Sequence, residues 1–227
     1  MKYAYVIFLL AVSSAGADLL SDVLLRVDQA AQKFRSVSTG VREIHYSGLF
    51  DETKVEDGTF KMRKLAKTGA ELLIDFTGRD RRTILIASNQ LTIYYPQANS
   101  VNIHNTRKVV KSVDQFLLVG FGTSNSELQR TYHVSLGGSE TIGTRKTTRI
   151  ELRPKKAETQ TLISTIELWI PDGQGTPIQE KLIVGGKSKD YYLFEFSNPQ
   201  VRTLSDPALP DSDFQLNLPP GVVSHKL

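Results

Sequence analysis

The stretch Ile84-Leu85-Ile86-Ala87-Ser88-Asn89-Gln90-Leu91-Thr92-Ile93 decides the fold, because two short apolar runs meet across a polar turn. In the first run Ile84 and Ile86 stand two residues apart, and in the second Leu91 and Ile93 do the same. A period of two is the pattern of a β-strand that buries one face. The polar residues 88–90 favour a turn. The stretch therefore predicts a β-hairpin within a larger sheet.

The same alternation continues on both sides of this hairpin. Toward the N-terminus, Phe60 and Met62 alternate with polar residues, and so do Leu72, Ile74 and Phe76. Further strands are predicted at 132–136, 147–153, 163–170, 178–184 and 191–196, separated by turns rich in Gly and Asp. About ten strands joined mostly by short turns predict an antiparallel meander that curls into a barrel or half-barrel.

The N-terminus has the pattern of an export signal. Lys2 precedes an apolar run over 3–12, which is too short to span a bilayer, and Ala15 and Ala17 supply the small side chains of a cleavage site. We expect cleavage after Ala17, which assigns 1–17 to a signal peptide and 18–227 to a single exported domain. The alternative is a helix that stays attached.

An amphipathic helix is predicted over 18–36, with Asp18 as its N-cap. Its apolar residues recur at spacings of three and four, which draws one stripe along the helix. The stripe consists of Leu20, Leu24, Val27, Ala31 and Phe34. We expect it to cover one end of the sheet.

Between Lys111 and Arg130 the alternation stops. Ser112-Val113-Asp114-Gln115 has the form of a capping box and predicts a helix, which continues through Phe116-Leu117-Leu118-Val119 and ends at Gly120. Ser124-Asn125-Ser126-Glu127 repeats the form and predicts a second short helix. Because the first helix is apolar on every side, it must be enclosed. It is either a plug of ordinary core or a lid over an apolar cavity.

The sequence offers no constellation for catalysis. It contains no cysteine, and its four histidines, His45, His104, His133 and His225, lack the spacing of metal ligands. The glycine patterns of nucleotide sites and the nucleophile elbow are also missing. We therefore expect no enzyme activity, no cofactor and no metal. The predicted leader carries one of the 28 basic residues and none of the 24 acidic ones, so the remaining chain is only mildly basic and nucleic acid is not an expected partner.

The order of these pieces resembles the outer-membrane lipoprotein carrier proteins (LolA-like). The resemblance is carried by the strands over 57–63, 72–76 and 84–96, where the last ends in Tyr94-Tyr95-Pro96. It continues through 166–178 and 192–198 to the closing Phe214-Gln215-Leu216-Asn217-Leu218-Pro219-Pro220-Gly221-Val222. It covers most of the chain after residue 17.

The resemblance implies mainly β structure with some α: an unclosed antiparallel half-barrel with an N-terminal helix and a helical lid, whose inner face holds acyl chains. It implies a monomeric periplasmic chaperone that takes acylated lipoproteins from a releasing transporter of the inner membrane. The cargo would be surrendered at the outer membrane, with an acceptor there as a further partner. Two other interpretations stay open, a lipoprotein-sensing regulatory module and a carrier of another lipid. A periplasmic hydrolase would need the catalytic residues that are missing.

The residues expected to line the lipid site are the apolar strand residues and the lid. They are Phe60, Met62, Leu72, Ile74, Phe76, Ile84, Ile86, Phe116, Leu117, Leu118, Trp169, Tyr192 and Phe194. Trp169 shares a strand face with Glu167, opposite Leu168, so which of these two sets faces inward is open.

The family also has an arginine, next to a proline, that ties the lid to the shell. The matching region here is Arg63-Lys64-Leu65, without the proline, so Arg63 and Lys64 are both candidates. Alternation places Lys64 on the face of Phe60 and Met62.

Overall fold

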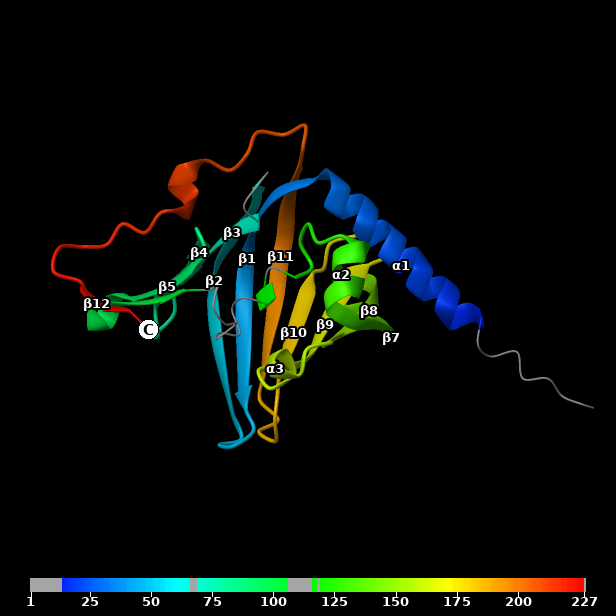
Figure 1. Cartoon of the computed structure of the whole chain (residues 1–227), viewed down its shortest axis with the longest axis horizontal. Coiled ribbons are helices and arrows are strands. Elements are labelled where there is room, and N and C mark those ends of the chain that lie inside the picture. Colours follow the sequence, from blue (N-terminus) through cyan, green and yellow to red (C-terminus); the bar gives the residue numbers. More distant parts are fainter. Residues whose placement is uncertain (1–13, 66–68, 106–115, 118, 227) are drawn as a thin grey trace, which may run out of the picture.

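The computed structural model describes residues 14–65, 69–105, 116–117 and 119–226, and its main element is one sheet of twelve strands (Figure 1). The first six strands are β1 (Phe34–Ser47), β2 (Glu52–Leu65), β3 (Gly69–Phe76), β4 (Arg82–Ala87), β5 (Gln90–Tyr95) and β6 (Ser100–Asn105). The others are β7 (Tyr132–Ile142), β8 (Arg145–Pro154), β9 (Ile163–Pro171), β10 (Gln179–Val184), β11 (Tyr191–Thr203) and β12 (Val223–Lys226).

Two meanders make up this sheet. The strand order is β12-β6-β5-β4-β3-β2-β1-β11-β10-β9-β8-β7, so β1 joins the N-terminal meander to the C-terminal one through its antiparallel pairing with β11. Neighbouring strands are antiparallel except β12, which pairs parallel to β6. The curved sheet ends at β12 and β7, so it is an open half-barrel (Figure 1). The predicted fold class is confirmed.

Helix α1 (Ser14–Lys33) packs its apolar stripe against the sheet and contacts α2 (Asn125–Thr131) and β7. Leu24 and Val27 of the predicted stripe are buried in the main hydrophobic cluster, and Val23, which is outside that stripe, is buried there too. The helix begins at Ser14, before the predicted cap at Asp18, and the expected cleavage after Ala17 stays a prediction. It also ends earlier than expected, because Phe34 already belongs to β1, where it pairs with Thr203 of β11.

The second predicted capping box forms as expected. Ser124 caps α2: its side chain accepts a hydrogen bond from the Glu127 amide, and the Glu127 carboxylate accepts one from the Ser124 amide at 2.8 Å. These two bonds satisfy amides that a helix end leaves free. The pKa of Glu127 is lowered first by the bond from the Ser124 amide to its carboxylate, and second by a bond that the Ser124 hydroxyl donates to the same carboxylate at 2.8 Å.

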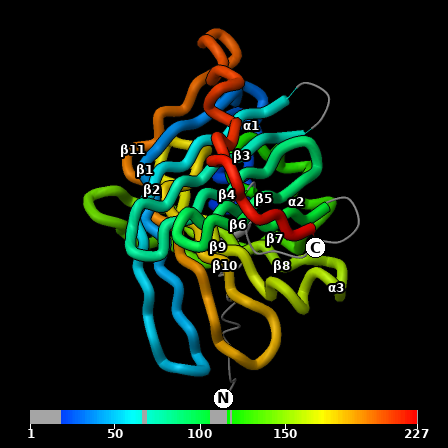
Figure 2. The backbone as a smooth tube through the Cα atoms, turned by 90° about the vertical axis from the view of Figure 1, so that its left-hand side faces the viewer, coloured from blue at the N-terminus to red at the C-terminus, as the bar shows by residue number. Residues whose placement is uncertain are grey.

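After β11 the chain forms a C-terminal arm, residues 204–222, that crosses the outer side of the N-terminal meander (Figure 2). A short 3-10 helix within the arm, Asp211–Phe214, contacts β3, and the arm ends in β12. Another short 3-10 helix, Pro96–Ala98, links β5 to β6, and helix α3 (Ala157–Gln160) links β8 to β9. Among the described residues, none of the helices is long and apolar enough to cross a membrane.

Candidate functional site

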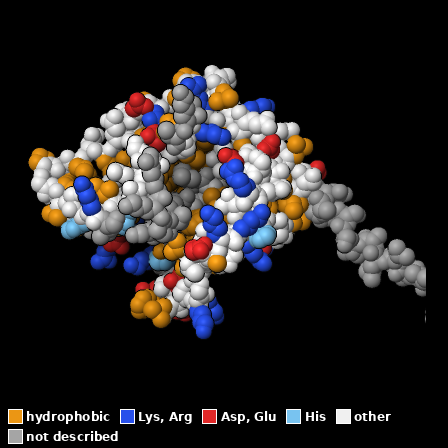
Figure 3. Space-filling model, in the orientation of Figure 1, with side chains coloured by type: hydrophobic (Ala, Val, Ile, Leu, Met, Phe, Trp, Pro, Cys, Tyr) orange, Lys and Arg blue, Asp and Glu red, His pale blue; other side chains and the backbone are white. Residues whose placement is uncertain are grey.

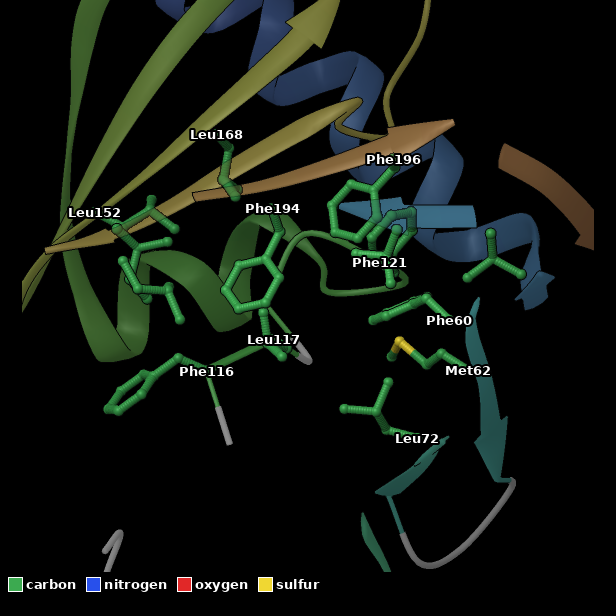
Figure 4. Close-up of a cluster of buried hydrophobic side chains, with 14 of the residues drawn as sticks. Phe60, Met62, Leu72, Phe116, Leu117, Phe121, Leu152, Leu168, Phe194 and Phe196 are labelled. Carbon is green, nitrogen blue, oxygen red and sulfur yellow. The ribbon is translucent and has the colours of Figure 1, made fainter. Parts of the chain in front are cut away.

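The inner face of the half-barrel carries a buried apolar cluster that draws on both meanders (Figure 4). Strand register builds it: Met62 on β2 pairs with Leu72 on β3, which pairs with Ile86 on β4. Because side chains alternate between the faces of a strand, residues two apart join the same cluster. The predicted residues that lie in it are Phe60, Met62, Leu72, Ile74, Phe76, Ile84, Ile86, Phe116, Leu117 and Phe194, and Tyr192 packs against it.

Trp169 requires a correction, because it lies on the other face. Its neighbours Leu168 and Ile170 belong to the inner cluster, whereas Trp169 does not. The Arg149 guanidinium lies 5.7 Å from the centre of the Trp169 ring. Trp169 is therefore part of the outer face and not of the candidate lipid site.

A segment of the chain covers the inner cluster. This covering segment spans residues 116–122, of which 118 is not described. Phe116 and Leu117 are buried members of the cluster, and Leu117 lies next to Phe194 (Figure 4). Phe116 and Leu117 form a 3-10 turn, in which the Val119 amide donates to the Phe116 carbonyl at 2.9 Å, and Val119–Gly122 are bends, so these residues do not continue the predicted α-helix. The beginning of that predicted helix, 112–115, and Leu118 lie outside the described residues.

Phe121 holds the covering segment to the sheet. Its ring centroid lies 5.5 Å from that of Phe60 and 5.1 Å from that of Phe196, with edge contact to Phe196, and 6.5 Å from that of Phe34. Gly122 follows with φ of +69°, and a Cβ there would approach the Phe34 ring to 2.5 Å. Glycine is therefore required for the backbone to turn so close to the ring. In the sequence the only signal of Phe121 is its place between two glycines, which does not predict this role.

Lys64 and Arg63 point in opposite directions. The Lys64 ammonium donates to the Gly122 carbonyl at 3.1 Å, which ties the end of β2 to the covering segment. Arg63 instead pairs with Glu71 at 2.6 Å and Asp211 at 2.7 Å, and it lies 4.5 Å from the centre of the Phe214 ring. Of the two candidates, Lys64 contacts the covering segment and Arg63 holds the C-terminal arm.

Replacing Lys64 and replacing Arg63 should loosen different parts of the chain. We expect Lys64→Met to increase amide hydrogen exchange in 116–123 and to leave the C-terminal arm unchanged. Because Lys64 is exposed, the loss of stability should stay below about 1 kcal/mol. Arg63→Met is the matched control, in which exchange should rise in 204–214. Mass spectrometry of peptic fragments measures both, and equal exchange at 116–123 in the two variants would contradict the assignment.

Two clefts lie on either side of Lys64. One has a volume of about 460 Å³ and separates the ends of β2 and β3 from the covering segment and α2. Its wall includes Met62, Leu65, Val119, Phe121 and Tyr132. The other, about 590 Å³, lies between α1, the end of β2 and the arm, next to Phe34 and Leu204. Both volumes fall in the range of small-molecule sites. Figure 3 shows a hollow on this side of the molecule, bordered by hydrophobic side chains.

A charged cluster occupies the inner face farther along the strands. Arg82 on β4 donates to Glu43 on β1 at 2.7 Å and to Glu56 on β2, and its guanidinium lies 4.1 Å from the centre of the Phe76 ring. Burial on its own lowers the pKa of Arg82, but the two carboxylates raise it above its ordinary value. Arg82 is therefore paired with two carboxylates, and this charged group marks the end of the apolar part of the inner face.

A further carboxyl on the inner face, that of Glu180, has no ion-pair or hydrogen-bond partner in the described part of the chain. It lies on β10 opposite Leu168 of β9 and Phe194 of β11, both members of the apolar cluster. Its exposed fraction is 0%, and neither carboxyl oxygen has a hydrogen-bond partner among the described residues. Burial raises the pKa of Glu180 well above the ordinary range. The sequence does not indicate a buried Glu180, because Gln179-Glu180-Lys181 has the composition of an exposed polar run.

Within residues 14–226, leaving out the gaps named above, no three acidic or histidine side chains lie close enough to hold an ion.

No family model and no curated protein sequence matches the chain, but solved structures share its fold. An uncharacterized conserved protein from Thermus thermophilus has a TM-score of 0.52 at 10% identity, over 91% of this chain and 98% of that one. MucB has a TM-score of 0.50 at 15% identity, over 89% of this chain. This chain spans only 64% of the length of that MucB chain. A LolA superfamily protein from Nitrosomonas europaea has a TM-score of 0.42 at 13% identity, over 87% of this chain and 97% of that one.

Identities this low establish the fold and nothing finer. The fold shared with these structures is an open half-barrel with an N-terminal helix, as the sequence predicts.

Proposed function

We propose that this chain is an exported periplasmic carrier that binds the acyl chains of lipoproteins on the inner face of its half-barrel, without catalysis. The observation that supports this most is the covering segment. Phe116, Leu117 and Phe121 occupy the inner face of an open sheet, where an acyl chain would make the same apolar contacts. The segment is in this proposal a lid that a ligand displaces.

Energetics favour such an exchange. Each CH₂ group that is kept from water contributes roughly 0.8 kcal/mol, so two or three acyl chains contribute many kcal/mol before ordering costs. A carrier must also release its cargo. Because the segment covers the same surface again when the lipid leaves, the net gain on loading is smaller than the gross gain. Release then needs no nucleotide hydrolysis by this chain.

The proposal extends to the partners and to the boundaries of the domain. Residues 18–227 form the carrier after removal of the signal peptide. Acylated lipoproteins are the cargo, an inner-membrane transporter supplies it, and the outer membrane receives it. Cleavage after Ala17 is tested by N-terminal sequencing of the exported protein.

A lipoprotein-sensing regulatory module is the second candidate. The likeness to MucB favours it, and MucB has also been solved in complex with MucA. The two functions differ in the fate of the ligand. A carrier passes bound acyl cargo to acceptor vesicles, whereas a sensor keeps the ligand and changes its binding of a protein partner.

Mass spectrometry of protein purified without detergent tests the carrier proposal. We expect acylated peptide or lipid to accompany the wild type and to be depleted at least severalfold in Met62→Arg, because a charge on the inner face of the sheet, beside the cleft, opposes the binding of an apolar ligand there. Leu25→Arg is the matched control, since Leu25 is 57% exposed on α1, and it should retain the cargo. Circular dichroism checks that both variants are folded.

The lipid content of the purified wild type decides against the proposal in two cases. If the wild type carries no lipid and takes up no apolar dye, the carrier function is wrong. If it carries a lipid without an attached peptide, the cargo is a free lipid and not a lipoprotein.

A further inference from the structure

Glu180 lies where an apolar ligand would bind. Strand alternation directs its side chain to the same face as Leu182, which is buried in the apolar cluster. The cross-strand neighbours of Glu180 are Leu168 on β9 and Phe194 on β11. The Phe194 side chain lies next to that of Leu117 (Figure 4). Displacing the covering segment therefore uncovers the part of the inner face that holds this carboxyl.

A carboxyl in such a place carries an unfavourable free energy, because water is lost and no hydrogen bond replaces it. Buried polar groups in proteins nearly always have partners, so an exception needs a reason. Both oxygens of Glu180 are exceptions among the described residues. Stability alone favours Leu at this position, which suggests that the partner is a ligand.

The surroundings keep this carboxyl neutral. Burial raises its pKa, and Glu43, two strands away in the same row, is an acid already bound to Arg82. Burial first, and second the charge that Glu180 carries once it ionises, raise the pKa of the Tyr132 hydroxyl to about 12. Tyr132 is one of the residues that line the 460 Å³ cleft. A neutral carboxyl has one O–H donor and one free carbonyl acceptor.

We propose that Glu180 is the polar anchor of the lipid site, and that its O–H donates a hydrogen bond to the ester or amide carbonyl at the head of an acyl chain. The inference rests on the proposed function and narrows it to acyl esters and amides. A cationic amphiphile fits less well, because an ion pair here requires both charges to lose water in an apolar cluster. A plain hydrocarbon leaves the carboxyl without a partner.

A matched pair of ligands tests this anchor. The ester 1-palmitoylglycerol and the ether 1-O-hexadecylglycerol share head group and chain length and differ in the carbonyl. Displacement of an apolar dye gives both affinities for the wild type. We expect the ester to bind roughly fivefold more tightly, the effect of one net hydrogen bond. Glu180→Leu should bind both ligands equally, and Glu180→Gln, which keeps an N–H donor, should retain the preference.

Infrared spectroscopy supplies a second readout that does not depend on a variant. With a ¹³C-labelled ester carbonyl, the C=O stretch should move to lower frequency on binding to the wild type, as it does for an accepted hydrogen bond. An unshifted band, an absent ester preference, or a preference that persists in Glu180→Leu would each overturn the anchor while leaving lipid binding intact. If neither glycerol lipid binds, the proposed function fails as well.

Discussion

Replacing Glu180 by Leu is expected to stabilise the protein, and the gain should increase as the pH rises. Removing a buried carboxyl without partners relieves roughly 1–3 kcal/mol of desolvation cost. The pH dependence follows from proton binding: because the folded pKa is raised above the ordinary value of 4.5, the folded state holds more protons than the unfolded state above that pH. Stability of the wild type therefore falls from about pH 4.5 up to the folded pKa, by up to ~1.4 kcal/mol per pH unit.

Urea unfolding of both proteins at several pH values measures this effect. Glu180→Gln is the matched control, because it removes the titration but keeps a buried polar group. Relative to the wild type, the free energy of unfolding of Glu180→Gln should rise with pH as that of Glu180→Leu does. The part of the gain that does not depend on pH should be smaller in Glu180→Gln. A difference between Glu180→Leu and the wild type that stays flat from pH 5 to pH 8 would show that Glu180 is not held neutral by burial.

Local patterns account for the part of this fold that the sequence predicts. Strand alternation depends on neighbouring residues only, and it identified most strands of the sheet. The capping box at Ser124 is also local, since its hydrogen bonds join residues three apart. The pairing of β1 with β11 is different, because it joins segments separated by most of the chain. Nothing in either segment indicates its distant partner, so the open sheet was predicted as a class and not as a strand order.

The errors at the candidate site have the same physical origin. On β9 both Leu168 and Trp169 are buried, so alternation cannot tell the inner face from the outer one. The covering segment is apolar on every side, and such a run has no periodicity that separates a helix from an irregular segment held by packing. Glu180 was missed because a polar residue in a strand normally marks the solvent face.

Phe121→Ala is expected to have opposite effects on stability and on ligand binding. The substitution removes a fully buried ring from contact with Phe34, Phe60 and Phe196, which destabilises the folded state by about 3–5 kcal/mol. The lost contacts are those that hold the covering segment against the inner face. Because a lid that competes with a ligand lowers the apparent affinity of the site, weakening the lid raises that affinity.

Phe214→Ala separates the two effects. Phe214 is also buried, but it belongs to the C-terminal arm and lies against Arg63. Phe214→Ala should lower the midpoint of urea unfolding without increasing the uptake of an apolar dye under native conditions. In Phe121→Ala, uptake should increase severalfold at a temperature where near-ultraviolet circular dichroism shows the protein to be folded. Equal uptake in the two variants would mean that general loosening admits the dye, and that the covering segment is core and not a lid.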